Sequence, residues 1–303
     1  MRFFYVLFFC CVVSQTVSAQ GCSDAGFCSI PYHVTGVAKN ETGLKNTLIT
    51  DVTFGLGEGN TRSFTASVLY RKRFSNRLSW DNKITAAYIS GLLGNVLNAG
   101  DLFSTVNYKI FAAEKTGVHI TGGIKIPLTA ANDKEKNSTL PMAYQPSLGT
   151  YDLLLGTAWT FLHKIDINAA LQLPVINANN NQYFRQPGDN KDFETTNAFR
   201  RKADALFRAG YLFETSNRKW NFKPNALAII HLGEDSYLKS TGQRINIDGS
   251  SGLTLNMNLQ SNYVLSKNRS LGFSIATPLI VRKTRPDGLT RSLTVGINYQ
   301  FNF

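Results

Sequence analysis

Apolar and polar residues alternate along most of this chain, from Thr47 to the last residue. In the final segment, Leu293, Val295, Ile297, Tyr299, Phe301 and Phe303 alternate with Ser292, Thr294, Gly296, Asn298, Gln300 and Asn302. Successive side chains of a strand point to opposite faces, so this segment predicts a strand with one apolar and one polar face. The same pattern recurs in 165–175, 220–232 and 253–265.

The alternation predicts about 12 strands. Their expected ranges are 47–56, 62–72, 78–90, 101–112, 117–129, 151–162, 164–176, 203–214, 220–232, 252–265, 270–282 and 289–303. Alternate connections are tight (73–77, 113–116, 163, 215–219, 266–269), whereas others are long (130–150, 177–202, 233–251). Short turns at one end and long loops at the other are typical of a transmembrane barrel. The fold class expected is therefore all-β: an antiparallel up-and-down transmembrane barrel over 47–303, with both termini periplasmic.

The N-terminal region predicts export. Met1 and Arg2 precede an apolar run from Phe3 to Val13, and a small-residue stretch ends at Ala19. This is the pattern of a signal peptide over 1–19, although acylation of Cys22 in a lipoprotein is an alternative. Residues 20–46 lack alternation and form either a periplasmic segment or a plug in the barrel. Cys22 and Cys28 favour a local disulfide in an oxidising compartment.

Composition and charge narrow the partners. The formal net charge of +12 would suggest nucleic acid in a cytosolic protein, but export points instead to anionic lipid headgroups, lipopolysaccharide or anionic solutes. Two cysteine sulfurs do not complete a tetrahedral metal site, so neither a metal nor another cofactor is expected. The C-terminal strand ending in aromatic Phe303 resembles the signal read by the barrel-assembly machinery of Gram-negative bacteria. The expected location is the bacterial outer membrane.

Charged residues of both signs fall on the inward face of the predicted strands. The solute-pathway candidates are Asp81, Lys125, Asp152, Arg208, Lys223 and His231, and four of them (Lys125, Asp152, Arg208 and Lys223) are expected at mid-height. Such charges either form ion pairs that hold a narrow barrel together or select a permeating solute. Three inward prolines, Pro127, Pro174 and Pro278, mark either kinks in the wall or strand ends.

Three segments carry resemblances to known families. The segments Gly123-Ile124-Lys125-Ile126-Pro127-Leu128 and 145–153 (QPSLGTYDL) resemble outer-membrane barrels related to the phenol-degradation meta-pathway proteins. These proteins are in turn similar to long-chain fatty-acid (FadL-like) channels. The resemblance implies a plugged monomeric barrel that passes small hydrophobic or aromatic molecules. The segment 21–28 resembles one found in uncharacterised outer-membrane proteins of the Bacteroidetes and implies no function.

The predicted function is passive uptake of an unidentified small molecule through an outer-membrane channel. A structural or adhesive barrel is an alternative, supported by the long loops. An outer-membrane lipid hydrolase is a weaker alternative, because it requires a serine nucleophile within reach of a histidine. The best local cluster for it is His231, Glu234, Asp235 and Ser236. We therefore predict no catalytic residues and no enzymatic activity.

Overall fold

The structure is a computed structural model that describes residues 46–112, 115–186, 193–287 and 291–303. The predicted signal peptide (1–19), residues 20–45 of the predicted plug, and both Cys22 and Cys28 lie outside the described residues. In the part that is described, no helix has the length and hydropathy needed to cross a bilayer.

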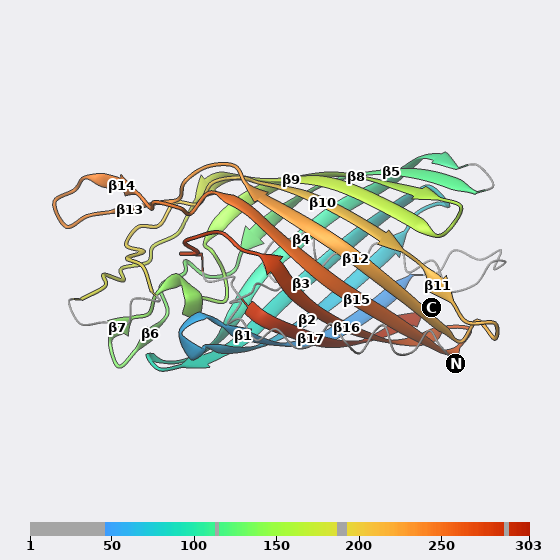
Figure 1. The fold of residues 1–303 in the computed structure, drawn as a ribbon, viewed down its shortest axis with the longest axis horizontal. Helices are drawn as coiled ribbons and strands as arrows, with labels where there is room; N and C mark the ends of the chain where they lie inside the picture. The colour runs from blue at the N-terminus through green and yellow to red at the C-terminus, as the bar shows by residue number, and fades with distance from the viewer. Residues whose placement is uncertain (1–45, 113–114, 187–192, 288–290) are drawn as a thin grey trace, which may run out of the picture.

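The chain folds into a closed antiparallel barrel of 12 strands (Figure 1). The wall is built from β1 (Thr47–Gly57), β2 (Arg62–Arg73), β3 (Leu78–Gly91), β4 (Gly94–Ala112), β5 (Thr116–Pro127), β8 (Thr150–Phe161), β9 (Ile165–Asn177), β10 (Asp204–Tyr211), β12 (Trp220–His231), β15 (Gly252–Ser266), β16 (Arg269–Ile280) and β17 (Arg291–Asn302). Neighbours in sequence are neighbours in the wall, and pairing of β1 with β17 closes the ring. The predicted fold class is confirmed.

The two ends of the barrel differ as the connection lengths predicted. Short turns join β2 to β3, β8 to β9 and β15 to β16 at the end that also holds the C-terminus (Figure 1). The long connections at the opposite end carry small hairpins, β6 (Lys134–Glu135) with β7 (Ser138–Thr139) and β13 (Ser236–Leu238) with β14 (Arg244–Asn246). We call these the short-turn end and the loop end.

Serine and asparagine side chains stabilise the short turns. Ser75 Oγ accepts hydrogen bonds from the backbone N–H groups of Arg77 and Leu78, at 3.1 and 3.0 Å. In the turn before β12, Asn217 Oδ1 accepts one from the Lys219 N–H at 3.0 Å. These side chains satisfy backbone donors that no strand partner reaches, which is why such residues favour turns.

The expected strand ranges were wrong in two places. Residues 91–100 were expected to form a connection, but β3 and β4 continue as one hairpin that turns between Gly91 and Gly94. Gly94 has a φ of 136°, which favours glycine. The predicted strand 203–214 is interrupted at Leu212, after which β11 (Phe213–Glu214) still pairs with β12.

Two of the three inward prolines lie at irregularities of the wall. Pro174 faces Asp152 beside a register shift, and Pro278 faces Asn256 beside another. Proline cannot donate to the ladder, so a bulge is where a strand accommodates it. Pro127 instead is the last residue of β5, so here it marks a strand end.

The outward face is apolar and exposed, as the alternation predicted. Exposed side chains on it include Val68, Ile84, Leu155, Ile275 and Ile297. A surface of this kind is stable against lipid acyl chains, whereas in water it would promote aggregation.

Replacing Ile297 with arginine should therefore destabilise the barrel in lipid. A cation at the lipid face near the bilayer midplane costs about 2–4 kcal/mol. The measurement is the free energy of unfolding of protein refolded in phosphatidylcholine vesicles. Asn298→Arg, which changes the neighbouring inward position, is the control, and an equal loss in both variants would contradict the assignment of faces.

Candidate functional site: a polar belt and a loop clasp at the mouth

A continuous row of polar side chains lines the inner wall near the loop end. Its members are Lys125 on β5, Asp152 on β8, Gln172 on β9, Asp204 on β10 and His231 on β12. In the strand register Lys125 pairs with Asp152, Gln172 with Asp204, and Asp204 with His231. We call this row the polar belt. All five residues are buried.

The first part of the belt is held by a buried ion pair. Lys125 Nζ lies 2.9 Å from Asp152 Oδ2 and 4.0 Å from Asp101 Oδ2 on β4. It also donates to Thr150 Oγ1 at 3.1 Å. Gln172 Nε2 donates to Asp152 Oδ2 at 2.5 Å and so links this group to the rest of the belt. Because one lysine faces two carboxylates, its loss would leave buried negative charge uncompensated.

His231 joins the barrel wall to a loop. Its Nδ1 lies 2.6 Å from Asp204 Oδ1, and its Nε2 lies 2.8 Å from Asp235 Oδ1 in the loop that follows β12. Carboxylates only accept hydrogen bonds, so both contacts require either a doubly protonated imidazole or a proton on one carboxyl group. In either case the contacts fix the start of this loop against the wall.

A second set of charges connects the loops to each other. Arg201 Nη2 lies 2.5 Å from Asp204 Oδ2 and 3.5 Å from Asp287 Oδ2. Arg282 Nη2 lies 2.8 Å from the same Asp287 oxygen, and its Nη1 donates to the Ser250 carbonyl at 2.6 Å. We call Arg201, Arg282, Asp287 and Asp235 the loop clasp, because they come from the three loops that precede β10 and follow β12 and β16.

The charges of the clasp stabilise one another. Burial alone would raise the pKa of Asp287, but the guanidinium groups of Arg282 and Arg201 outweigh it and lower that pKa. Burial likewise acts to lower the pKa of Arg201, whereas the carboxylates of Asp204 and Asp287 raise it. Asp287 and Arg201 are therefore both ionised at neutral pH.

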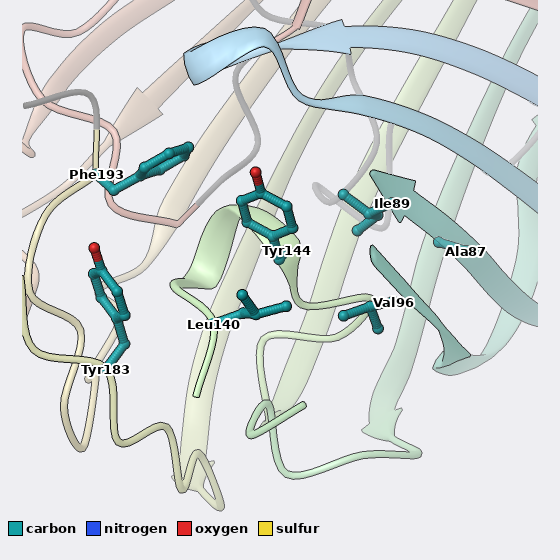
Figure 2. Close-up of a cluster of buried hydrophobic side chains, with 7 residues drawn as sticks. All are labelled: Ala87, Ile89, Val96, Leu140, Tyr144, Tyr183 and Phe193. Atoms are coloured by element: carbon teal, nitrogen blue, oxygen red, sulfur yellow. The ribbon is translucent and has the colours of Figure 1, made fainter. Parts of the chain in front are cut away.

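Apolar side chains from the loops pack into the mouth beside the clasp. Figure 2 shows Leu140, Tyr144, Tyr183 and Phe193 against Ala87, Ile89 and Val96 of the β3–β4 hairpin. Tyr144 is fully buried, and its hydroxyl accepts a hydrogen bond from the Leu93 N–H at 3.1 Å. A second cluster of Ala131, Met142, Leu148, Phe199 and Ile247 joins three loops. The loops thus form a small core against the β3–β4 hairpin at the loop end.

Beside the belt and toward the short-turn end, an apolar cluster lies on the inner wall. Phe103, Leu154, Leu206 and Leu227 point inward from β4, β8, β10 and β12 and bury one another. Each is at most 3% exposed. These four side chains bury one another's surface and present almost no apolar surface to a solute.

The short-turn half of the same wall contains further charges. Arg71 forms a bidentate ion pair with Asp81, at 2.8 and 2.6 Å. Lys223 is paired with Asp166 on β9. Arg208 faces inward between them, opposite Asn168 in the register.

The six predicted pathway residues all face inward, but they do not form one site. Lys125 and Asp152 were expected at mid-height and lie instead near the loop end, where they belong to the belt with His231. Lys223 was also expected there, but it lies close to the short-turn end, as does Asp81. Arg208 lies nearest the middle. Alternation predicts whether a side chain points inward or outward, but it does not predict how far along the barrel axis that side chain lies. The strands differ in length and begin at different levels, so equal positions in sequence do not lie at equal levels in the wall.

Sequence reasoning missed most of the clasp. Arg201, Arg282 and Asp287 lie in loops, where no periodicity relates position to direction. Asp235 was noted only as part of a possible hydrolytic cluster. No signal in the sequence pairs residues 86 positions apart, as Arg201 and Asp287 are.

The arrangement of that cluster does not match a hydrolase. Both ring nitrogens of His231 contact carboxylates. Ser236 is buried in β13, where its Oγ accepts a hydrogen bond from Arg244 at 3.3 Å. Both side chains are buried, whereas a lipid hydrolase requires a nucleophile that reaches the leaflet.

The comparisons with known proteins concern the fold alone. A crystal structure of an outer-membrane channel from Pseudomonas putida F1 has a TM-score of 0.57 and 13% identity, covering 90% of this chain and 99% of that one. The NanC porin has a TM-score of 0.48 and 11% identity, covering 84% and 100%. The KdgM porin in complex with disordered oligogalacturonate has a TM-score of 0.45 and 8% identity, covering 85% and 99%. No family model and no curated protein matches the chain.

Asp287→Asn should loosen the loops, because it removes the carboxylate shared by two buried guanidinium groups. Breaking a buried ion pair from one side costs about 3–5 kcal/mol. We expect faster amide hydrogen exchange in residues 193–203 and 232–251. The difference from wild type should be present at neutral pH and shrink below about pH 4, because a carboxylate with a lowered pKa contributes its full stability above its unfolded pKa and loses it as the pH falls toward its folded pKa.

Asp248→Asn provides the matched control for this variant. It breaks the exposed ion pair of 2.8 Å between Asp248 and Lys283 in the same region, and we expect no measurable change. Equal rates of amide hydrogen exchange in the two variants would show that the clasp does not hold the loops.

Proposed function

We propose that the protein is a channel of the bacterial outer membrane that passes a small polar solute and whose outer mouth is closed by its loops. The observation that carries this proposal is the inner face, where polar and charged side chains recur on every strand while the outer face is apolar. A polar lumen inside an apolar wall is the arrangement of aqueous channels. The fold shared with the channel from Pseudomonas putida F1 supports it.

The chemical class of the permeating solute is considered next. The family resemblance implies hydrophobic or aromatic molecules, and that class stays a prediction. A Bacteroidetes origin also stays a prediction. The inner wall supports a polar solute instead, because its apolar layer around Leu154 and Leu227 is buried. Charged and amide side chains make up most of the remaining lining.

The membrane partners are proposals of the same kind. The Phe303 ring stacks on Phe301 at 5.6 Å, and the backbone of Phe303 pairs with Asn46 at the barrel seam. An exposed terminal aromatic residue at this place supports recognition by the barrel-assembly machinery. The basic character of the chain supports contact with lipopolysaccharide.

Planar-bilayer recording tests the channel function. We expect small or infrequent current steps for the wild type, because the clasp and the loop core cover the mouth. Asp287→Asn should increase the open probability by about tenfold or more, because the loss of about 3–5 kcal/mol from the closed mouth shifts the equilibrium by at least that factor, and Asp248→Asn should not. Absence of ion current in all three proteins would favour a structural or adhesive barrel. The folded hairpins of the long loops are the observation that supports this alternative.

Deleting residues 20–45 tests the predicted plug. Asn46 is retained because its backbone pairs with Phe303. If the segment occupies the lumen, the deletion should raise the conductance of the Asp287→Asn variant further. An unchanged conductance, in a variant that still migrates as a folded barrel in cold gels, would place the segment outside the lumen.

A further inference from the structure

Basic side chains surround the short-turn end of the barrel. Each of the five turns there, which follow β2, β4, β8, β11 and β15, contains at least one lysine or arginine, and the first residue of β16 is another. All of these side chains are exposed, and none forms an ion pair with a residue that the structure describes. We call them the basic ring: Arg77, Lys115, Lys164, Arg218, Lys219, Lys267 and Arg269.

Acidic side chains are scarce on the outer surface of this end. Among the described residues there, Glu214 is the exposed acid, and the carboxylate of the last residue, Phe303, adds a second negative charge. Glu114 also falls in one of the turns of the sequence but lies outside the described residues. The other acids of this half face the lumen from β1, β3 and β9: Asp51, Asp81 and Asp166. The exposed charge of the turns is therefore almost entirely positive.

The loop end carries exposed charges of both signs. Its accessible acids lie among the basic residues of the same loops, and they are Asp133, Glu135, Glu194, Glu234 and Asp248. Glu194 is paired with Arg185 at 3.4 Å, and Asp248 is paired with Lys283 at 2.8 Å. An anionic surface therefore meets charges of one sign at the short-turn end and mixed charges at the loop end.

Exposed apolar side chains lie beside the basic ring. Phe74, Leu162 and Phe213, in the turns or next to them, are 54%, 61% and 54% exposed. The Arg269 guanidinium lies over the ring of Phe301, 5.6 Å from its centroid, and the two residues pair across β16 and β17 on the outward face. Apolar side chains with basic groups beside them are typical of the membrane interface, where the apolar part lies in lipid and the cation reaches the headgroups.

The three tryptophans of the chain mark the same level of the barrel. Trp80 is near the start of β3, Trp159 is near the end of β8, and Trp220 is the first residue of β12. Lys72 pairs with Trp80 in the register of β2 and β3. Tryptophan is enriched where a membrane meets water. The basic ring therefore lies at the level of the lipid headgroups.

From the sign of the charge and the aromatic residues beside it, we infer that the basic ring binds anionic phospholipid headgroups of the periplasmic leaflet. The short turns of transmembrane barrels face the periplasm, where the leaflet is phospholipid, whereas lipopolysaccharide occupies the opposite leaflet. Lysine and arginine near such a surface are attracted to it within a Debye length. An acidic periplasmic protein would not require exposed aromatic and apolar residues at the same level. This partner goes beyond the proposed channel function and differs from lipopolysaccharide.

Quenching of tryptophan fluorescence by brominated lipid tests the inference, because all three tryptophans lie beside the ring. The protein is refolded in phosphatidylcholine vesicles that contain dibrominated phosphatidylglycerol or, as the reference, an equal fraction of dibrominated phosphatidylcholine. Bromine quenches tryptophan on contact, so the difference measures how far anionic lipid is enriched at this end. At low ionic strength we expect enrichment of about fivefold, the effect of one basic residue near a headgroup. The enrichment should disappear in about 1 M salt, where charges are screened within about 3 Å.

Two variants with equal loss of charge locate the effect. The ring variant combines Arg77→Gln, Lys164→Gln, Arg218→Gln and Lys267→Gln, and it should lose most of the enrichment. The control variant combines Lys134→Gln, Lys136→Gln, Lys202→Gln and Lys239→Gln, which are exposed positions at the loop end. It should keep the enrichment of the wild type. Migration in cold gels shows that each variant is folded.

Three outcomes would overturn the inference. The first is equal quenching by the two brominated lipids in the wild type, and the second is an equal loss of enrichment in the two variants. The third is relief of quenching by unlabelled lipid A but not by unlabelled phosphatidylglycerol, which would assign the ring to lipopolysaccharide. None of these measurements requires ion current, so their failure would leave the proposed channel untouched.

Discussion

The rest of the structure depends on one constraint, which is that a strand in lipid has no water to satisfy its backbone donors and acceptors. A closed ring of strands meets this constraint because every backbone group then pairs with a neighbouring strand. Here closure occurs between β1 and β17, and Asn46 and Phe303 extend that seam at the short-turn end. Closure also divides the side chains into a lipid face and a lumen face. The strict alternation of the sequence is the consequence.

Many charged side chains are buried inside the closed ring of strands at the loop end. Ions removed from water are stable only when counter-charges and hydrogen bonds replace the solvent. The belt and the clasp provide this replacement, with Asp204 contacting both His231 and Arg201. Well-packed apolar residues could give equal stability, so stability alone does not require this network. The charges instead determine where the loops lie, because each contact holds a particular loop at a particular place on the wall. A mouth closed by a few ion pairs can also open when one of them is lost.

The sequence was sufficient to predict the strands of the barrel but not the contacts of the candidate site. Alternation predicted nearly every strand to within a few residues, because most lumen positions are polar and most lipid positions are apolar. It failed at 91–100, where Asn95, Asn98 and Gly100 obscured the pattern of a strand that continues past the expected turn. It gave the inward direction of Lys125 and His231 correctly. It could not give their partners Asp101 and Asp235, because those contacts depend on where tilted strands end and loops return.

The chemistry of the lumen emerges only when the strands are arranged in a ring. Along the sequence, the amides of β15 and β17 look like ordinary polar positions of a barrel strand. In the ring they become neighbours, and the charged strands β3 to β10 lie across from them. The inner wall therefore has two unlike surfaces, which no single strand shows. The arrangement of the strands in the ring, more than the average polarity of the wall, decides which side chains face one another across the lumen.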